Sequence, residues 1–132
     1  MPKKVLIAED EDNILVSLEF LMRNDGYEVW IATRGDEVMA GIRHFRPDLV
    51  LLDVMLPRRN GFELCSDIRK NAEWDAMKII IISAKGREYE VRRGLNAGAN
   101  AYVTKPFSTS ELREQVRQLI GDGRPDRANE NY

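Results

Sequence analysis

The sequence predicts an α/β protein with a doubly wound parallel sheet of five strands in the order 2-1-3-4-5. Two observations predict this fold class. Short apolar runs alternate five times with segments whose apolar residues recur at the spacing of one helical face. The runs are almost continuously apolar rather than alternating, as expected of parallel strands covered by helices on both faces. Right-handed crossovers leave few strand orders, and this order suits such a sheet.

The first part of the chain shows two expected strands and two expected helices. Residues 5–8 form an apolar run that stops at a group of acids, and residues 14–21 carry apolar side chains at helical spacing. Asp25-Gly26 ends this first helix. Residues 28–32 form the second strand, and residues 38–45 form a second helical stripe that breaks before a proline.

The middle of the chain continues the alternation. Residues 49–52 are a third apolar run that ends at an aspartate, and residues 64–68 indicate a helix after a turn. Residues 79–82 are four consecutive isoleucines and therefore the least ambiguous strand. Apolar residues one helical turn apart over 91–95 indicate the fourth helix, and Gly98 is a typical helix stop.

The last strand and helix complete the pattern. Residues 101–103 form the fifth expected strand. Ser108 and Glu111 have the spacing of a capping box, and apolar residues at helical spacing follow them. We therefore expect one domain over residues 1–121, followed by a polar, flexible C-terminal tail over residues 122–132.

The composition excludes several classes of protein. The chain has 132 residues and a formal net charge of -2, which argues against direct nucleic-acid binding through bulk positive charge. One cysteine and one histidine rule out an internal disulfide, a cysteine-based metal cluster and a two-histidine active site. No apolar stretch approaches the roughly 20 residues that span a bilayer, and no signal-peptide pattern is present. We expect a protein of the cytoplasm without membrane contact.

The residues that carry chemistry follow the apolar runs. In a sheet of this type, ligands bind at the carboxyl ends of the strands, at the switch point between the first and third strands. Glu9 and Asp10 follow the first strand and Asp53 follows the third, so these carboxylates are expected to converge. Ser83-Ala84 follow the fourth strand and Lys105-Pro106 follow the fifth.

Carboxylates that share one pocket need either a proton or a cation between them. Oxygen ligands with room for water suit Mg²⁺ better than Zn²⁺, and Mg²⁺ commonly takes phosphate oxygens as further ligands. Lys105 adds a charge that can pair with Asp53 or a phosphoryl group, Ser83 adds a hydroxyl donor, and Ala84 leaves space. The residues therefore predict an acyl-phosphate site in which Asp53 is the nucleophile.

With these residues in place, the sequence resembles the receiver domain of two-component response regulators, which has the flavodoxin-like (βα)5 fold. The resemblance runs from about Lys4 to Ile120. The segments that carry it, in order, are Ala8-Glu9-Asp10-Glu11, Asp53-Val54-Met55-Leu56-Pro57 with Gly61, Ser83-Ala84, and Tyr102-Val103-Thr104-Lys105-Pro106-Phe107. Their order and spacing are more specific than any single motif.

The resemblance implies how the site works. Asp53 would accept a phosphoryl group from a histidine kinase or a histidine phosphotransfer protein. The implied ligands of Mg²⁺ are Glu9, Asp10, Asp53 and the backbone carbonyl of Met55. The implied contacts of the phosphoryl oxygens are Ser83, Ala84 and Lys105. The peptide bond before Pro106 would be cis.

The resemblance also implies a switch. Phosphorylated Asp53 would draw Ser83 inward, and Tyr102 would fill the space that Ser83 leaves. The surface of the fourth helix, the fifth strand and the fifth helix would then change and control a downstream protein partner or an output domain. The chain would be a monomer or a phosphorylation-dependent dimer. Any catalysis would act on the protein itself, so we do not expect an enzyme with turnover.

The sequence departs from the family at several positions. Glu9 stands where Asp is commoner, and Ser83 replaces the frequent Thr. Met55 and Lys85 occupy the two positions that shape the access of water to the phosphoryl group. Asn100-Ala101 stands where many DNA-binding response regulators carry an acidic pair. This difference argues against the dimer contacts of that subfamily in this chain.

Three alternatives stay open at this point. A flavin or nucleotide binder on the same sheet order needs a Gly/Ser/Thr-rich loop after the first strand, where this chain has acids. A phosphatase of the haloacid-dehalogenase type needs a second acid two residues after its nucleophile, where this chain has Met55. A receiver-like interaction module that works without phosphorylation is separated from a phosphorylated switch only by a labelling experiment.

Overall fold

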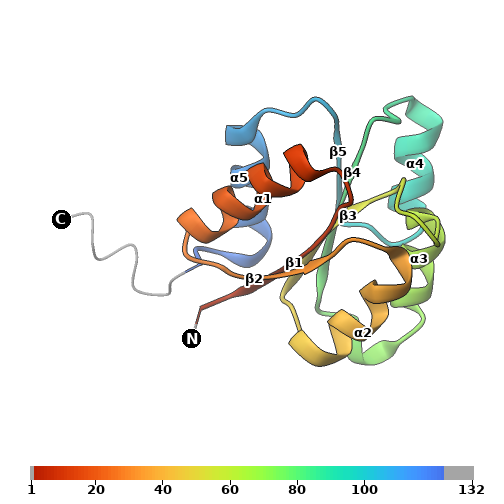
Figure 1. Ribbon diagram of the computed structural model, residues 1–132. Coiled ribbons are helices and arrows are strands. Elements are labelled where there is room, and N and C mark those ends of the chain that lie inside the picture. Colours follow the sequence, from red (N-terminus) through yellow and green to blue (C-terminus); the bar gives the residue numbers. More distant parts are fainter. Residues whose placement is uncertain (1, 124–132) are drawn as a thin grey trace.

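The strands form one parallel sheet in the order β2-β1-β3-β4-β5, which confirms the predicted topology (Figure 1). The computed structural model describes residues 2–123. Its strands are β1 (Lys4–Ala8), β2 (Glu28–Ala32), β3 (Leu49–Asp53), β4 (Lys78–Ser83) and β5 (Ala101–Thr104). Its helices are α1 (Asp12–Asn24), α2 (Gly35–Phe45), α3 (Gly61–Arg69), the 3-10 helix η1 (Ala72–Trp74), α4 (Glu88–Asn96) and α5 (Thr109–Ile120).

Helices cover both faces of the sheet, with α1 and α5 on one side and α2, α3 and α4 on the other (Figure 1). Side chains of β1 alternate between the two cores that result. Val5 and Ile7 pack in the cluster that includes the apolar residues of α1 and α5. Leu6 and Ala8 pack in the cluster that includes those of α2 and α3. Because both sides of the strand are buried, the run has to be apolar throughout.

The helices begin earlier than their apolar pattern indicates. The fourth helix begins at Glu88, three residues before the first apolar position at Val91. First turns are rich in polar residues, because free backbone N–H groups there need acceptors. Ser108 shows this at α5, where its hydroxyl accepts from the backbone N–H of Glu111 at 3.3 Å. Asn60 does the same at α3, accepting from Phe62 at 2.8 Å.

The packed part of the chain extends past the end of the predicted domain. The carbonyl of Gly121 accepts a hydrogen bond from the Tyr27 hydroxyl at 2.6 Å. The carbonyl of Gly123 accepts one from the backbone N–H of Lys3 at 3.0 Å, and Gly123 is buried against Gly26. Residues 124–132 of the predicted tail lie outside the described residues.

No helix among residues 2–123 combines the length and the apolar character needed to cross a bilayer.

Candidate functional site

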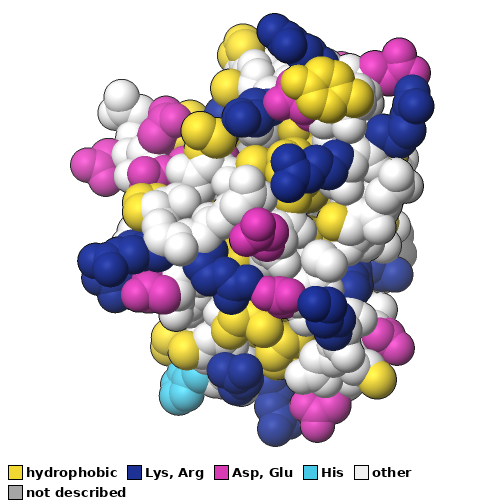
Figure 2. Space-filling model, turned by 90° about the vertical axis from the view of Figure 1, so that its right-hand side faces the viewer, with side chains coloured by type: hydrophobic (Ala, Val, Ile, Leu, Met, Phe, Trp, Pro, Cys, Tyr) yellow, Lys and Arg dark blue, Asp and Glu magenta, His cyan; other side chains and the backbone are white. Residues whose placement is uncertain are grey.

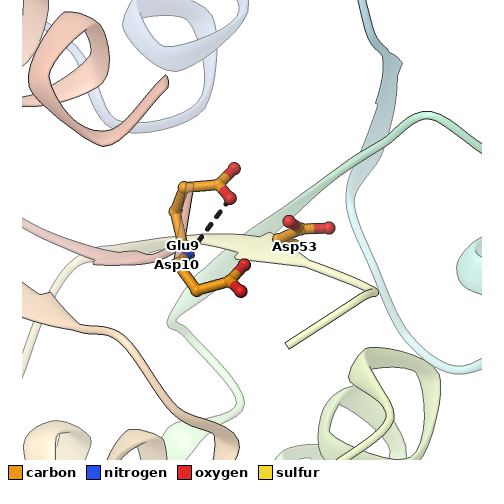
Figure 3. Close-up of side chains that lie close together, drawn as sticks. All are labelled: Glu9, Asp10 and Asp53. Carbon is orange, nitrogen blue, oxygen red and sulfur yellow. Dashed lines mark hydrogen bonds between the residues drawn. The ribbon is translucent and has the colours of Figure 1, made fainter. Parts of the chain in front are cut away.

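Three carboxylates meet at the carboxyl ends of β1 and β3. Parallel pairing aligns these two neighbouring strands, with Ala8 beside Leu52, so the residues that follow emerge at one edge of the sheet. Carboxylate oxygens of Glu9, Asp10 and Asp53 all lie within 4.8 Å of one another around one space (Figure 3). The convergence predicted from the sequence is therefore present.

Glu9 is buried beneath this cluster, with a relative exposure of 1%. Its Oε2 accepts backbone hydrogen bonds from Asp10 and Glu11, each at 3.1 Å. Its Oε1 lies 2.9 Å from Nζ of Lys105, but accepts no hydrogen bond of good geometry from any described residue. Burial raises the pKa of the Glu9 carboxyl to about 7; the neighbouring Asp53 adds to the rise and Lys105 opposes it.

Lys105 ties the two buried carboxylates together. Its Nζ donates to Oδ2 of Asp53 at 3.1 Å, in addition to its contact with Glu9. Burial alone would lower the pKa of the Lys105 ammonium, but the two carboxylates outweigh burial and the pKa is raised. The other oxygen of Asp53 accepts from the backbone N–H of Met55 at 3.0 Å. One cation is therefore held between two buried acids.

Ser83 and Tyr102 are linked through Lys85. The Ser83 hydroxyl is fully buried and accepts from the backbone N–H of Lys85 at 3.0 Å. The Tyr102 hydroxyl donates to the carbonyl of the same Lys85. Burial raises the pKa of the Tyr102 phenol, while the nearby Ser83 hydroxyl opposes the rise. The half-buried Tyr102 ring is stacked on Phe62, with centroids 6.5 Å apart.

Two glycines allow neighbouring segments to pack closely around the site. A Cβ on Gly94 of α4 would lie 2.8 Å from Cδ2 of Tyr102, so only glycine leaves room for the ring in this position. A Cβ on Gly61 would lie 2.5 Å from Cα of Val54, against the backbone that follows Asp53. The resemblance includes Gly61, but the role of Gly94 was missed. Its place inside an amphipathic helix is the one signal that could have indicated close packing.

The remaining predicted residues surround the opening of the site. The Met55 side chain is 58% exposed. Ala84, Lys105 and Pro106 line an apolar groove of about 480 Å³. The Lys105–Pro106 peptide bond is cis, as the resemblance implies.

The arrangement suits phosphoryl chemistry better than metal-free acid–base chemistry. The donor set consists of carboxylate oxygens, which Mg²⁺ prefers. The ammonium of Lys105 contacts both Glu9 and Asp53, at 2.9 and 3.1 Å. An anionic group bound to Asp53 would need positive charge and hydrogen-bond donors, which Lys105 and the buried hydroxyl of Ser83 can supply.

Comparisons with known proteins agree with this geometry. The family model of the response regulator receiver domain matches residues 5–117. The chain is 40% identical over 126 residues to the phosphate regulon transcriptional regulatory protein PhoB of Rhizobium meliloti (strain 1021), covering 96% of this chain and 56% of that protein. The chain thus spans a little over half the length of this curated relative.

Solved structures agree as well. A putative response regulator from Chloroflexus aurantiacus J-10-fl has a TM-score of 0.85 at 34% identity, covering 90% of this chain and 98% of that one. The receiver domain of a sensor histidine kinase from Pseudomonas aeruginosa PAO1, with magnesium in its active-site cleft, has a TM-score of 0.83 at 27% identity, covering 92% and 99%. The chain therefore belongs to the response regulator receiver domain family of two-component signalling.

Proposed function

We propose that this chain is a phosphorylation-activated switch in which Asp53 accepts a phosphoryl group with the help of Mg²⁺. The observation that carries the proposal is the meeting of Glu9, Asp10 and Asp53 within 4.8 Å, with Lys105 bound to Asp53 at 3.1 Å. Family membership supports it, because the residues stand in the family's order along the chain.

The residues present fit Mg²⁺. Its ligands would be carboxylate oxygens of Glu9, Asp10 and Asp53 with the backbone carbonyl of Met55. When bound, Mg²⁺ supplies positive charge between the carboxylates and the phosphoryl oxygens. The meeting of three carboxylates within 4.8 Å, against the single ammonium of Lys105 that contacts two of them, supports a further cation at this place. The magnesium in the active-site cleft of the Pseudomonas aeruginosa receiver domain supports it from a relative.

Phosphoryl transfer from a phosphohistidine to Asp53 requires no further reactant. An oxygen of Asp53 attacks phosphorus, the P–N bond to the donor histidine breaks and a P–O bond to Asp53 forms. Lys105 exchanges its ion pair with Asp53 for one with the phosphoryl oxygens. Ser83 supplies a hydroxyl donor to the same oxygens, and the small Ala84 leaves room for them. The reaction modifies the chain itself, so the protein is not an enzyme with turnover.

The contacts of Ser83 explain how phosphorylation of Asp53 would change the surface of the domain. When the Ser83 hydroxyl turns toward a phosphoryl group, it gives up its bond from the Lys85 N–H and alters the segment whose carbonyl holds Tyr102. Tyr102 belongs to β5 and packs against Gly94 of α4. The α4–β5–α5 surface is therefore the one that changes, by selection of a state already present in the free protein.

The phosphodonor is a histidine kinase or a histidine phosphotransfer protein. The apolar groove beside Lys105 includes Ile14 and Phe107, and it supports docking of an apolar helix next to Asp53. Val16 and Phe20 of α1, the helix that carries Ile14, are also exposed, at 66% and 68%. Exposed apolar side chains gathered on one helix are typical of protein contacts.

The phosphorylated surface controls an output domain or a separate protein in the cytoplasm. The name of the Rhizobium relative describes a transcriptional regulator, and this supports a DNA-binding output as one form of partner. The receiver domain itself does not bind nucleic acid. Arg113 and Arg117 of α5 pair within the chain with Asp25 and Glu114, so an ion-paired dimer would have to break these pairs.

The test is incubation with acetyl phosphate and Mg²⁺, followed by intact mass. One phosphoryl group is expected on the wild type and none on Asp53→Ala, while Asp36→Ala, an exposed acid on α2, serves as the matched control and stays labelled. Chelation of the metal is expected to abolish labelling. Equal labelling of Asp53→Ala, or none of the wild type under conditions that label other receivers, overturns the proposal.

The alternative, an interaction module that works without phosphorylation, gives a different result. Pull-down with beryllofluoride-treated protein as bait is expected to enrich a partner that untreated protein and treated Asp53→Ala do not retain. Equal capture by all three baits favours the alternative. Gel filtration under the same treatment distinguishes a monomer from a phosphorylation-dependent dimer.

A further inference from the structure

A second cavity lies at the opposite edge of the sheet from the acidic cluster. It has a volume of about 490 Å³, within the range of small-molecule sites. It is formed by the end of α2, the loop to β3 and the segment between α3 and β4. Its apolar wall includes Ile42 and Met77, both buried, and the half-buried Trp74.

Arg69 holds the loop that carries Trp74 in place. This guanidinium donates to the carbonyl of Trp74 at 3.0 Å, to that of Gly98 at 2.9 Å and to Oδ1 of Asn100 at 2.8 Å. Arg69 therefore ties the loop that carries Trp74 to the turn before β5. The backbone that carries Trp74 is therefore held in place before any ligand arrives, which lowers the entropy cost of binding.

Two cations of this cavity have no anionic partner. Arg43 lies with its guanidinium 5.9 Å from the centre of the Trp74 ring, and Arg46 lies three residues further on. Neither forms an ion pair within the part of the chain that the structure describes. Arg46 also adopts the left-handed conformation, with φ 53° and ψ 61°, where glycine is the favoured residue.

The acidic residues that line the cavity restrict the class of ligand that it can bind. Asp48 and Glu73 also line the cavity, so a molecule with several negative charges is disfavoured. One oxygen of Asp48 accepts from the backbone N–H of Lys4 at 2.8 Å, and among residues 2–123 no donor is found for its second oxygen, which can accept from a ligand N–H. Figure 2 shows hydrophobic side chains at the surface, between Lys and Arg side chains, in the lower part of the view.

We propose that this cavity binds a small planar aromatic molecule that carries one negative group and one N–H donor. The aromatic ring lies against Trp74 and Met77. The carboxylate or other anionic group pairs with Arg43 and Arg46, and the N–H group faces Asp48 and Glu73. No residue of the cavity belongs to the acidic site, so the proposal does not depend on phosphorylation of Asp53.

The test is a titration of the full chain with indole-3-acetate, followed by the two indole N–H resonances of the ¹⁵N-labelled protein. A saturable shift of the Trp74 signal is expected, with a Kd of about 1 mM or tighter, while the Trp30 signal stays in place. Indole, which lacks the anionic group, is expected to bind about tenfold more weakly. The absence of a saturable Trp74 shift, or equal affinity for the two probes, overturns the proposal.

Variants separate binding from a structural role of the arginines at the end of α2. Arg46→Gly suits the left-handed conformation and is expected to leave thermal unfolding unchanged or improved while weakening indole-3-acetate about tenfold. Arg43→Gln is expected to weaken it similarly. Arg23→Gln, an exposed arginine on α1, is the control and keeps wild-type affinity. Wild-type affinity in both cavity variants contradicts the proposal.

Discussion

Substitution of Glu9 by Gln tests the electrostatics of the acidic site without phosphorylation. Glutamine keeps the size of the side chain and an oxygen that can accept from the backbone N–H groups of Asp10 and Glu11. It removes the titration of a carboxyl group that is only 1% exposed. The pH dependence of the difference between wild type and variant therefore reports the titration of Glu9 together with its interactions with Asp53 and Lys105.

The magnitude follows from the pKa of Glu9. Burial raises it from 4.5 to about 7, a difference that corresponds to about 3 kcal/mol. Below pH 4.5 the carboxyl is protonated in both states, and between pH 4.5 and about 7 it is ionised mainly in the unfolded chain. The folded state then binds more protons, so the stability of the wild type falls as pH rises through this window and levels off above it.

The measurement is urea denaturation of wild type and Glu9→Gln between about pH 5 and about pH 8, with a chelator present. The free energy of unfolding of the wild type is expected to fall relative to the variant by up to about 3 kcal/mol over this range. Glu63→Gln, at an exposed position of α3, is the control and should show no such trend. A flat difference between wild type and Glu9→Gln, or one of opposite sign, refutes the reasoning.

The other predictions concern the metal and the two close-packed glycines. Mg²⁺ affinity of the wild type is expected to rise with pH up to about 7, measured by calorimetry, because Glu9 must lose its proton to bind; a pH-independent affinity contradicts this. Gly94→Ala is expected to destabilise the wild type by about 1 kcal/mol, since overpacking against Tyr102 outweighs the gain in helix propensity. In a Tyr102→Ala background the cost should fall but not vanish, because Cδ1 of Ile81 would still lie 2.9 Å from the new methyl group; additive urea-denaturation effects of the two changes contradict the contact. Gly61→Ala is expected to cost about 2 kcal/mol and to slow labelling by acetyl phosphate, because its methyl group meets the backbone of Val54; wild-type stability and labelling contradict it.

Most of the fold could be predicted from the sequence because the signals are local. Strands buried on both faces need runs such as Ile79–Ile82, and such runs mark where side chains emerge at the sheet edge. The meeting of Glu9 with Asp53 followed from strand order alone. Apolar periodicity places the start of a helix such as α4 late, because its first turn carries polar residues such as Glu88, whereas the capping box at Ser108 predicted the start of α5 correctly.

The parts of the site that depend on packing between distant segments could not be predicted. A glycine inside a helix, such as Gly94, can indicate close packing, but the sequence does not show that its neighbour is the Tyr102 ring, 2.8 Å from its Cβ position. The carbonyl of Lys85 that accepts from Tyr102 is likewise a backbone atom of another loop. The cavity beside Trp74 likewise results from the meeting of α2 with the segment before β4, two parts of the chain that the sequence does not show to be in contact.

The hydrogen bond between Lys3 and Gly123 has a practical consequence for protein engineering. Its 3.0 Å length places the two ends of the described chain side by side, just ahead of the first residue of β1. Glu9 follows the other end of that strand, so affinity tags or fluorescent reporters fused at either end leave the acidic site open. A short peptide joining these ends should give a circular permutant, whose new termini can be placed in an exposed loop.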